Sequence, residues 1–88
     1  MTRFIIMGKK NLDGIVRDLT DLLVKKNVPR KKINHKYNFV KSKDLDSLNI
    51  ILFITEVEKK FSIKFKKNDL LKKNFQNIMG LSKIIKNI

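Results

Sequence analysis

The clearest pattern of hydrophobic positions lies in residues 11–26. Its apolar side chains recur every three or four residues, the spacing that places them on one face of an α-helix. Asn11 is expected to cap this helix, and Pro29 to end it, since proline cannot continue the hydrogen-bond ladder. The pattern predicts an amphipathic helix whose buried face is formed by Leu12, Ile15, Val16, Leu19, Leu22 and Leu23.

Residues 27–46 show no helical period. A loop of about 20 residues is long for a small domain, and loops of this length are usually functional or disordered. Apolar side chains are nevertheless spaced through the segment, which favours an ordered loop that packs over the helices. These anchors are Val28, Ile33, Tyr37, Phe39, Val40 and Leu45.

Residues 47–61 predict a second helix that is apolar on two sides. At 100° per residue, one side carries Ile50, Phe53, Ile54, Val57 and Phe61, and the other carries Leu48, Ile51, Leu52 and Thr55. A small domain cannot easily bury a helix completely. We therefore expect one face to enter the core and the other to contact a partner.

The rest of the chain predicts a basic connector over residues 62–74, a short helix at 68–73 and a last amphipathic helix at 75–88. The expected fold is all-α and a single domain, with three main helices, one short helix and a long first loop. Residues 1–10 form an N-terminal extension to which the pattern assigns no role.

Composition excludes several classes. The chain has 88 residues and no cysteine, so neither disulfides nor a cysteine-based metal site can stabilise it. Its longest apolar run, Ile50–Ile54, is far shorter than the ~20 residues that span a bilayer. Phe4–Met7 is shorter than the ~7–15 residues of a signal-peptide core. We expect a cytoplasmic, monomeric protein without a membrane span.

The formal net charge of +13 allows two interpretations. A basic domain can bind nucleic acid or an anionic membrane surface. However, 18 lysines, 12 isoleucines and 9 asparagines, with no alanine, are also typical of an AT-rich genome. On composition alone the two interpretations carry equal weight.

Catalysis has little support in the sequence. His35 is the only histidine, and Gly8, Gly14 and Gly80 are isolated, so no glycine-rich phosphate loop exists. We expect no catalytic residue and no metal site. The informative stretch is Asp46-Ser47-Leu48, in which either Asp46 or Ser47 is expected to cap the second helix. A serine there is exposed at the positive end of a helix, which favours a phosphate group.

Residues 11–88 resemble the acyl carrier protein family. The resemblance rests on the first helix, on Phe39-Val40, on Asp46-Ser47-Leu48 seven residues after Phe39, and on the second helix ending at Phe61. It implies a four-helix bundle that is not an enzyme. A phosphopantetheinyl transferase is expected to attach 4′-phosphopantetheine from coenzyme A to Ser47, with Asp46 helping to place Mg²⁺ and the serine. The arm's thiol then carries an acyl group as a thioester to acyl-loading and acyl-using enzymes.

The resemblance also assigns roles to the two faces of the second helix. Partner contact is implied for Leu48, Asn49, Ile51, Leu52 and Thr55. The bundle interior, where some family members shelter an acyl chain, is implied for Ile50, Phe53, Ile54, Val57 and Phe61.

The chain departs from the family in its charge. Lys43 and Asp44 replace a common Leu-Gly, and Asn49, Leu52 and Lys59 stand at positions that are often acidic. We therefore expect a specialised carrier, in a fatty-acid, polyketide or other acyl pathway, whose partners recognise an apolar face or carry acidic patches. The alternatives are an aminoacyl or peptidyl carrier of the same fold, a basic helical domain that binds nucleic acid, and a helical interaction protein without a cofactor.

Overall fold

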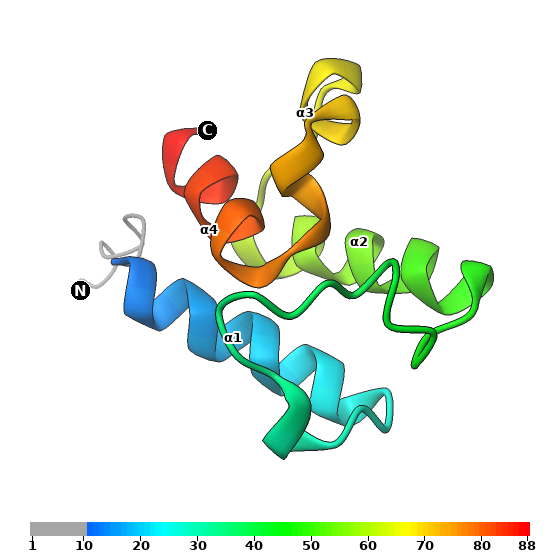
Figure 1. Ribbon diagram of the computed structural model, residues 1–88. Coiled ribbons are helices and arrows are strands. Elements are labelled where there is room, and N and C mark those ends of the chain that lie inside the picture. The colour runs from blue at the N-terminus through cyan, green and yellow to red at the C-terminus, as the bar shows by residue number, and fades with distance from the viewer. Residues whose placement is uncertain (1–10) are drawn as a thin grey trace.

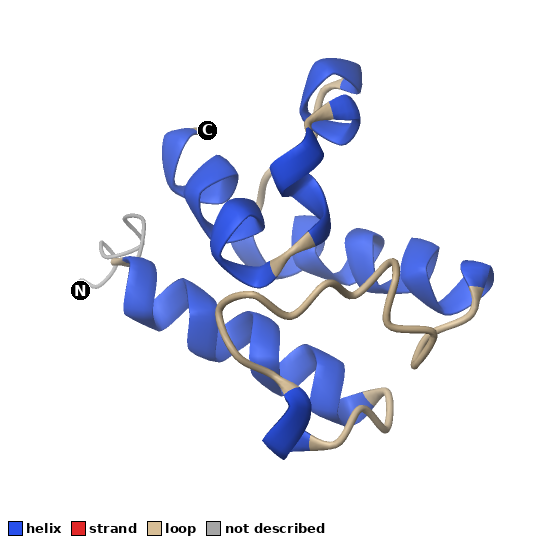
Figure 2. Cartoon of the chain, in the orientation of Figure 1, coloured by secondary structure: helices blue, strands red, loops and turns tan. Residues whose placement is uncertain are grey.

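The computed structural model describes residues 11–88, and the expected extension at residues 1–10 lies outside them. The fold is all-α, as predicted (Figure 2). Over the described residues the chain forms no strand, only one isolated bridge between Asn38 and Asn77. It also contains no helix long and apolar enough to cross a membrane there. The helices are α1 (Leu12–Lys25), η2 (Arg30–Lys32), α2 (Ser47–Phe61), α3 (Lys67–Leu71), η3 (Lys73–Gln76) and α4 (Ile78–Asn87), of which η2 and η3 are 3₁₀ helices.

The first helix, α1, begins as the sequence predicts and ends for a different reason. The Asn11 side chain accepts a hydrogen bond from the Gly14 N–H at 2.8 Å. The expectation that Pro29 ends the helix is wrong, because α1 already ends at Lys25. Asn27 there adopts a left-handed conformation with φ 73°, and the Val28 N–H donates to the Leu23 carbonyl at 3.2 Å. Leu23 and Val28 are both buried, which completes a Schellman motif.

The second helix, α2, runs in the opposite direction to α1 (Figure 1). It ends in the same way as α1, because Ser62 takes the left-handed conformation with φ 54° and the Ile63 N–H donates to the Glu58 carbonyl at 3.0 Å. The long loop 27–46 leads from the end of α1 back to the start of α2 and contains η2.

The boundaries in the last third of the chain differ from the predicted ones. The short helix expected at 68–73 is α3, Lys67–Leu71, and the helix expected at 75–88 is α4, Ile78–Asn87. Residues Lys73–Gln76 form η3 instead. The cause is Asn77, whose backbone is extended and whose side chain accepts the Gly80 N–H at 2.7 Å. This N-cap starts α4 three residues later than the apolar pattern indicates.

Four phenylalanine rings connect the segments of the core. The rings of Phe39 and Phe53 lie 5.0 Å apart, those of Phe39 and Phe75 6.3 Å, and those of Phe65 and Phe75 5.1 Å, all edge to face. All four side chains are buried, and burial of one such ring contributes about 1.5–3 kcal/mol. The rings therefore join the long loop, α2, the connector before α3, and η3.

Hydrogen bonds fasten the long loop to the start of α4. The Phe39 N–H donates to the Gln76 carbonyl at 3.0 Å, and the Ile78 N–H donates to the Tyr37 carbonyl at 3.1 Å. Four of the six predicted loop anchors are buried, namely Val28, Tyr37, Phe39 and Leu45. The expectation of an ordered loop that packs over the helices is confirmed for this structure.

Gly80 permits the close approach of α4 and η3. A Cβ atom at this position would lie 2.1 Å from the Asn74 carbonyl oxygen, which belongs to backbone and cannot turn aside. The first turn of α4 can pack against η3 only because residue 80 lacks a side chain.

We expect Gly80→Ala to lower the free energy of unfolding by about 1–3 kcal/mol, the usual effect of overpacking. The sign is informative, because alanine in a helix would otherwise stabilise by about 1 kcal/mol. Urea unfolding followed by circular dichroism measures the effect. The exposed Lys83→Ala in the same helix should change stability by less than about 0.5 kcal/mol. A Gly80→Ala variant as stable as the wild type would contradict the packing described.

Candidate functional site

Ser47 is the first residue of α2 and is exposed. Asp46, immediately before it, has extended backbone, and its carboxylate accepts hydrogen bonds from the Asn49 N–H at 2.8 Å and the Asn49 side-chain amide at 3.1 Å. Asp46, and not Ser47, therefore caps the helix. The Ser47 hydroxyl is not used by the cap and lies at the surface, beside the positive end of a 15-residue helix.

The loop segment before Ser47 is held by Leu45 and by a group of polar side chains. Leu45 is buried, two residues before the serine. The Asp44 carboxylate accepts hydrogen bonds from Lys32 and from the Tyr37 hydroxyl, both at 2.8 Å. The Ser42 hydroxyl lies 2.9 Å from the Tyr37 oxygen. Because the single phenol proton points to Asp44, Ser42 donates to Tyr37.

This polar group was not predicted from the sequence. Its members are separated along a loop without a period, and no spacing rule links Lys32 to Asp44. The only sequence signal was Tyr37, expected as an apolar anchor. In the structure its ring is buried while its hydroxyl bonds to Asp44, so one residue both anchors the loop and orders the turn before Ser47.

The group shifts the pKa of two of its members. Burial, followed by the hydrogen bond to Asp44 and its negative charge, raises the pKa of Tyr37 to about 12. Hydrogen bonds from Lys32 and then from Tyr37 lower the pKa of Asp44. The loop before Ser47 therefore holds a neutral phenol and an ionised carboxylate over the whole physiological range.

Lys43, between Ser42 and Asp44, has a left-handed backbone with φ 68°. Non-glycine residues adopt this region infrequently, and the surrounding hydrogen bonds of Ser42 and Asp44 hold the turn.

The partner face predicted for α2 is on the surface. Leu48, Ile51 and Leu52 are 64, 61 and 41% exposed, high values for large apolar side chains. Thr55 is also exposed, and its hydroxyl donates to the Ile51 carbonyl at 3.0 Å. Asn49 is half-buried, because its side chain turns back to Asp46. The two-sided wheel thus correctly predicts an exposed apolar face, and the contact of that face with a partner stays a prediction.

The opposite face of α2 packs into the core. Phe53 and Val57 are buried, while Ile50, Ile54 and Phe61 are partly buried and pack against the core cluster. The side chains that line the two surface pockets described below do not include any of these five. In this structure the five residues pack in or against the core. That they separate to admit an acyl chain stays a prediction.

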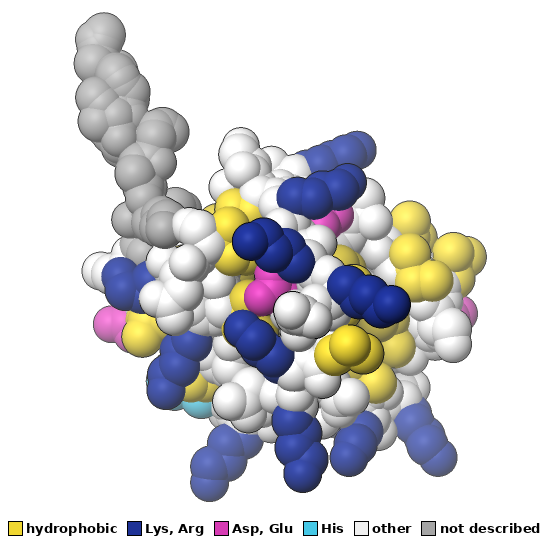
Figure 3. Space-filling model, turned by 90° about the horizontal axis from the view of Figure 1, so that it is seen from above, with side chains coloured by type: hydrophobic (Ala, Val, Ile, Leu, Met, Phe, Trp, Pro, Cys, Tyr) yellow, Lys and Arg dark blue, Asp and Glu magenta, His cyan; other side chains and the backbone are white. Residues whose placement is uncertain are grey.

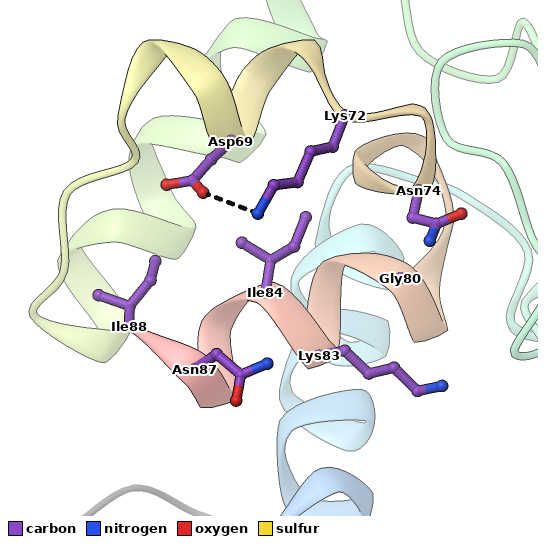
Figure 4. Close-up of a pocket in the computed structure, with 8 residues that line it drawn as sticks. All are labelled: Asp69, Lys72, Asn74, Gly80, Lys83, Ile84, Asn87 and Ile88. Carbon is purple, nitrogen blue, oxygen red and sulfur yellow. Dashed lines mark ion pairs between the residues drawn. The ribbon is translucent and has the colours of Figure 1, made fainter.

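One pocket, of about 270 Å³, lies between α3, η3 and α4 (Figure 4). Asp69 and Lys72 form an ion pair of 3.4 Å across its rim, and Ile84 and Ile88 point into it. The other, of about 550 Å³, lies between α1 and the loop beside the exposed His35. Neither contains Ser47, and no cluster of three or more metal-ligating side chains exists within residues 11–88.

No protein-family model matches the chain, and no curated protein matches it. The candidate site is therefore defined by the geometry of Asp46, Ser47 and the exposed face of α2, together with the spacing of these residues in the sequence.

We expect Asp46→Ala to lower the free energy of unfolding by about 1 kcal/mol, because the first turn of α2 would lose its cap. Asp46→Asn should retain stability, since asparagine caps helices equally well. Thermal unfolding of the three proteins measures both effects. Equal stability of the alanine variant and the wild type would contradict the role of Asp46 as the cap.

We expect the Tyr37 phenol to ionise near pH 12 in the folded protein. Tyr37 is the only tyrosine and tryptophan is absent, so tyrosinate absorbance reports this residue alone. The pKa of a tyrosine in the unfolded chain is about 10. The contribution of the neutral Tyr37 phenol to the free energy of unfolding is therefore complete below pH ~10 and is lost as pH rises through about 12. In Asp44→Asn the transition should move to lower pH, since the Asp44 charge and hydrogen bond both raise the pKa of Tyr37. A wild-type transition at pH 10 in folded protein would contradict the burial of Tyr37.

Proposed function

We propose that this protein is an acyl carrier protein whose attachment site for 4′-phosphopantetheine is Ser47. The observation that carries the proposal is the placement of an exposed serine at the first position of α2, directly after the residue that caps the helix. An exposed apolar helix face begins one residue later, at Leu48. A serine that carries a phosphodiester arm beside a surface for docking enzymes is the arrangement that a carrier needs.

The order of elements supports the same proposal. Three long helices, a short α3 between α2 and α4, and a long ordered loop between α1 and α2 are compatible with the bundle that the family resemblance implies. Phe39 lies eight residues before Ser47 and is fully buried against Phe53 of α2. The sequence spacing behind the family resemblance thus corresponds to a physical contact between the loop and α2.

The site is suited to receive a phosphate group. In the proposed reaction the Ser47 oxygen forms a bond to the β-phosphorus of coenzyme A, and the diphosphate bond breaks. The serine proton goes to the transferase, and adenosine 3′,5′-bisphosphate leaves. The new phosphodiester would lie at the N-terminus of α2, where the helix dipole stabilises a negative charge by about 0.3–1 kcal/mol. When attached, the arm supplies a thiol that holds an acyl group as a thioester.

Asp46 serves this proposal in two ways. Its carboxylate orders the first turn of α2, which presents the Ser47 hydroxyl to solvent. Its negative charge is also available next to the serine, where the transferase holds Mg²⁺ in the proposed reaction. Asp46→Asn separates the two roles, because it retains the cap and removes the charge.

We expect incubation with coenzyme A, Mg²⁺ and a promiscuous phosphopantetheinyl transferase to add one phosphopantetheinyl group to the wild type and none to Ser47→Ala. Intact mass spectrometry measures the addition. Asp46→Asn should be modified about 10-fold or more slowly than the wild type, while its thermal stability stays the same.

A matched control is Ser62→Gly. Within residues 11–88, Ser62 is the one exposed serine besides Ser47. Glycine suits the left-handed backbone of this position. This variant should be modified like the wild type. An unmodified wild type that is folded by circular dichroism, or a Ser47→Ala variant that still gains the group, would refute the proposal.

A further inference from the structure

The surface that follows Ser47 combines exposed apolar and basic side chains. Leu48, Ile51, Leu52, Thr55 and Lys59 follow one another at spacings of one to four residues and lie on the same face of α2. We call these five residues the α2 strip. All five are exposed, so the strip is a row of apolar side chains that ends in a lysine.

Both acidic side chains of α2 are occupied within the molecule. Glu56 forms an ion pair of 3.1 Å with Lys26, at the end of α1. The Glu58 carboxylate accepts the Phe65 N–H at 2.8 Å and so holds the connector that leads to α3. The two glutamates of α2 are therefore both engaged in contacts within this chain and do not form an acidic row for a basic partner.

The segment after α2 adds positive charge. Nine lysines follow Glu58, against one acid, Asp69. Asp69 accepts the Lys66 N–H at 2.9 Å and forms an ion pair with Lys72 at 3.4 Å. Figure 3 shows Lys and Arg side chains spread over one face, with hydrophobic side chains exposed among them. Lys59, at the end of the α2 strip, and the neighbouring Lys60 are both exposed, so the end of the strip away from Ser47 is basic.

We propose that the α2 strip is the docking surface for partner proteins whose apolar contact patch is bordered by Asp and Glu side chains. The inference rests on the proposed carrier function, and it assigns the charge of the enzymes that handle this carrier. Apolar burial at Leu48, Ile51 and Leu52 supplies affinity, and the lysines set the rate of encounter and the choice of partner.

A protein fits this surface better than a nucleic acid or a membrane does. A nucleic acid is bound through phosphates and gains nothing from a row of three exposed apolar side chains. The lysines are also spread through the sequence, over the long loop, α2, the connector and α4, and do not concentrate along one helix. In the strip, Thr55 adds an uncharged polar group between apolar and basic positions. An apolar centre with a polar, charged border is the usual anatomy of a protein–protein interface.

The test uses two synthetic helical peptides that share a stripe of leucines, one bordered by glutamates and the other by lysines. Binding to ¹⁵N-labelled full-length protein is followed by NMR at low and high salt. We expect the acidic peptide to bind about 10-fold or more tightly at low salt, to weaken as salt screens the charges, and to perturb the amides of the α2 strip.

Two charge-reversal variants separate a local effect from net charge. Lys59→Glu should weaken binding of the acidic peptide by about threefold or more, whereas Lys31→Glu should not. Both variants change the net charge equally, and η2, which holds Lys31, lies on the side of α1 away from α2 (Figure 1). Ile51→Ser should weaken binding about 10-fold through lost apolar burial.

Equal binding of the two peptides, or equal loss in the two charge variants, would overturn the proposal. If phosphatidylglycerol vesicles or single-stranded DNA perturb the amides of the α2 strip at lower concentrations than the acidic peptide does, the strip binds that ligand in preference to a protein. This result would also overturn the proposal. The mass measurement on Ser47 is independent of these titrations. A modified chain that does not bind the acidic peptide refutes only the docking surface, and an unmodified chain that binds it refutes the carrier function.

Discussion

The contact between Phe39 and Phe53 holds together the parts of the molecule on which the proposed site depends. Phe39 comes from an irregular loop and Phe53 from the middle of α2, and both are fully buried with ring centroids 5.0 Å apart. Phe75 packs on Phe39 from η3, so three segments meet at one ring. Deletion of a buried phenylalanine side chain costs about 3–5 kcal/mol, a large share of the stability of a domain this small.

The position of Ser47 follows from this contact. Once Phe39 is in place, Tyr37 and Asp44 order the turns on either side of it, and buried Leu45 brings the chain to Asp46. The cap then starts α2 at the serine. The loop is thus a positioning element as well as a connection, which explains why so long a segment without regular structure is ordered. Its polar and aromatic contacts act together with its backbone hydrogen bonds to the start of α4, which satisfy backbone groups that have no partner in a regular element.

The features that were predictable from the sequence are those with a period or a local rule. The helical spacing of Leu12, Ile15 and Leu19 predicts α1, and the two apolar sides of residues 47–61 predict both the buried Phe53 and the exposed Ile51. The features that were missed depend on contacts between distant residues. Phe75 continues the apolar spacing of α4 but belongs to η3, because Asn77 starts the helix later. The bond of Asp44 to Lys32 and Tyr37 joins loop residues that no spacing rule relates. For the candidate site, Asp46, Ser47 and the apolar face were predicted, whereas the internal use of Glu56 and Glu58 became visible only in three dimensions.

The most direct measurement of the central claim is to locate the attached group along the chain. Trypsin cuts after Lys43 and Lys59 and releases residues 44–59, a peptide with a single serine, Ser47. Fragmentation of this peptide after incubation with coenzyme A and the transferase should place one phosphopantetheinyl group on Ser47, with Thr55 unmodified. A modified protein whose 44–59 peptide is bare, or carries the group on another residue, would contradict the account.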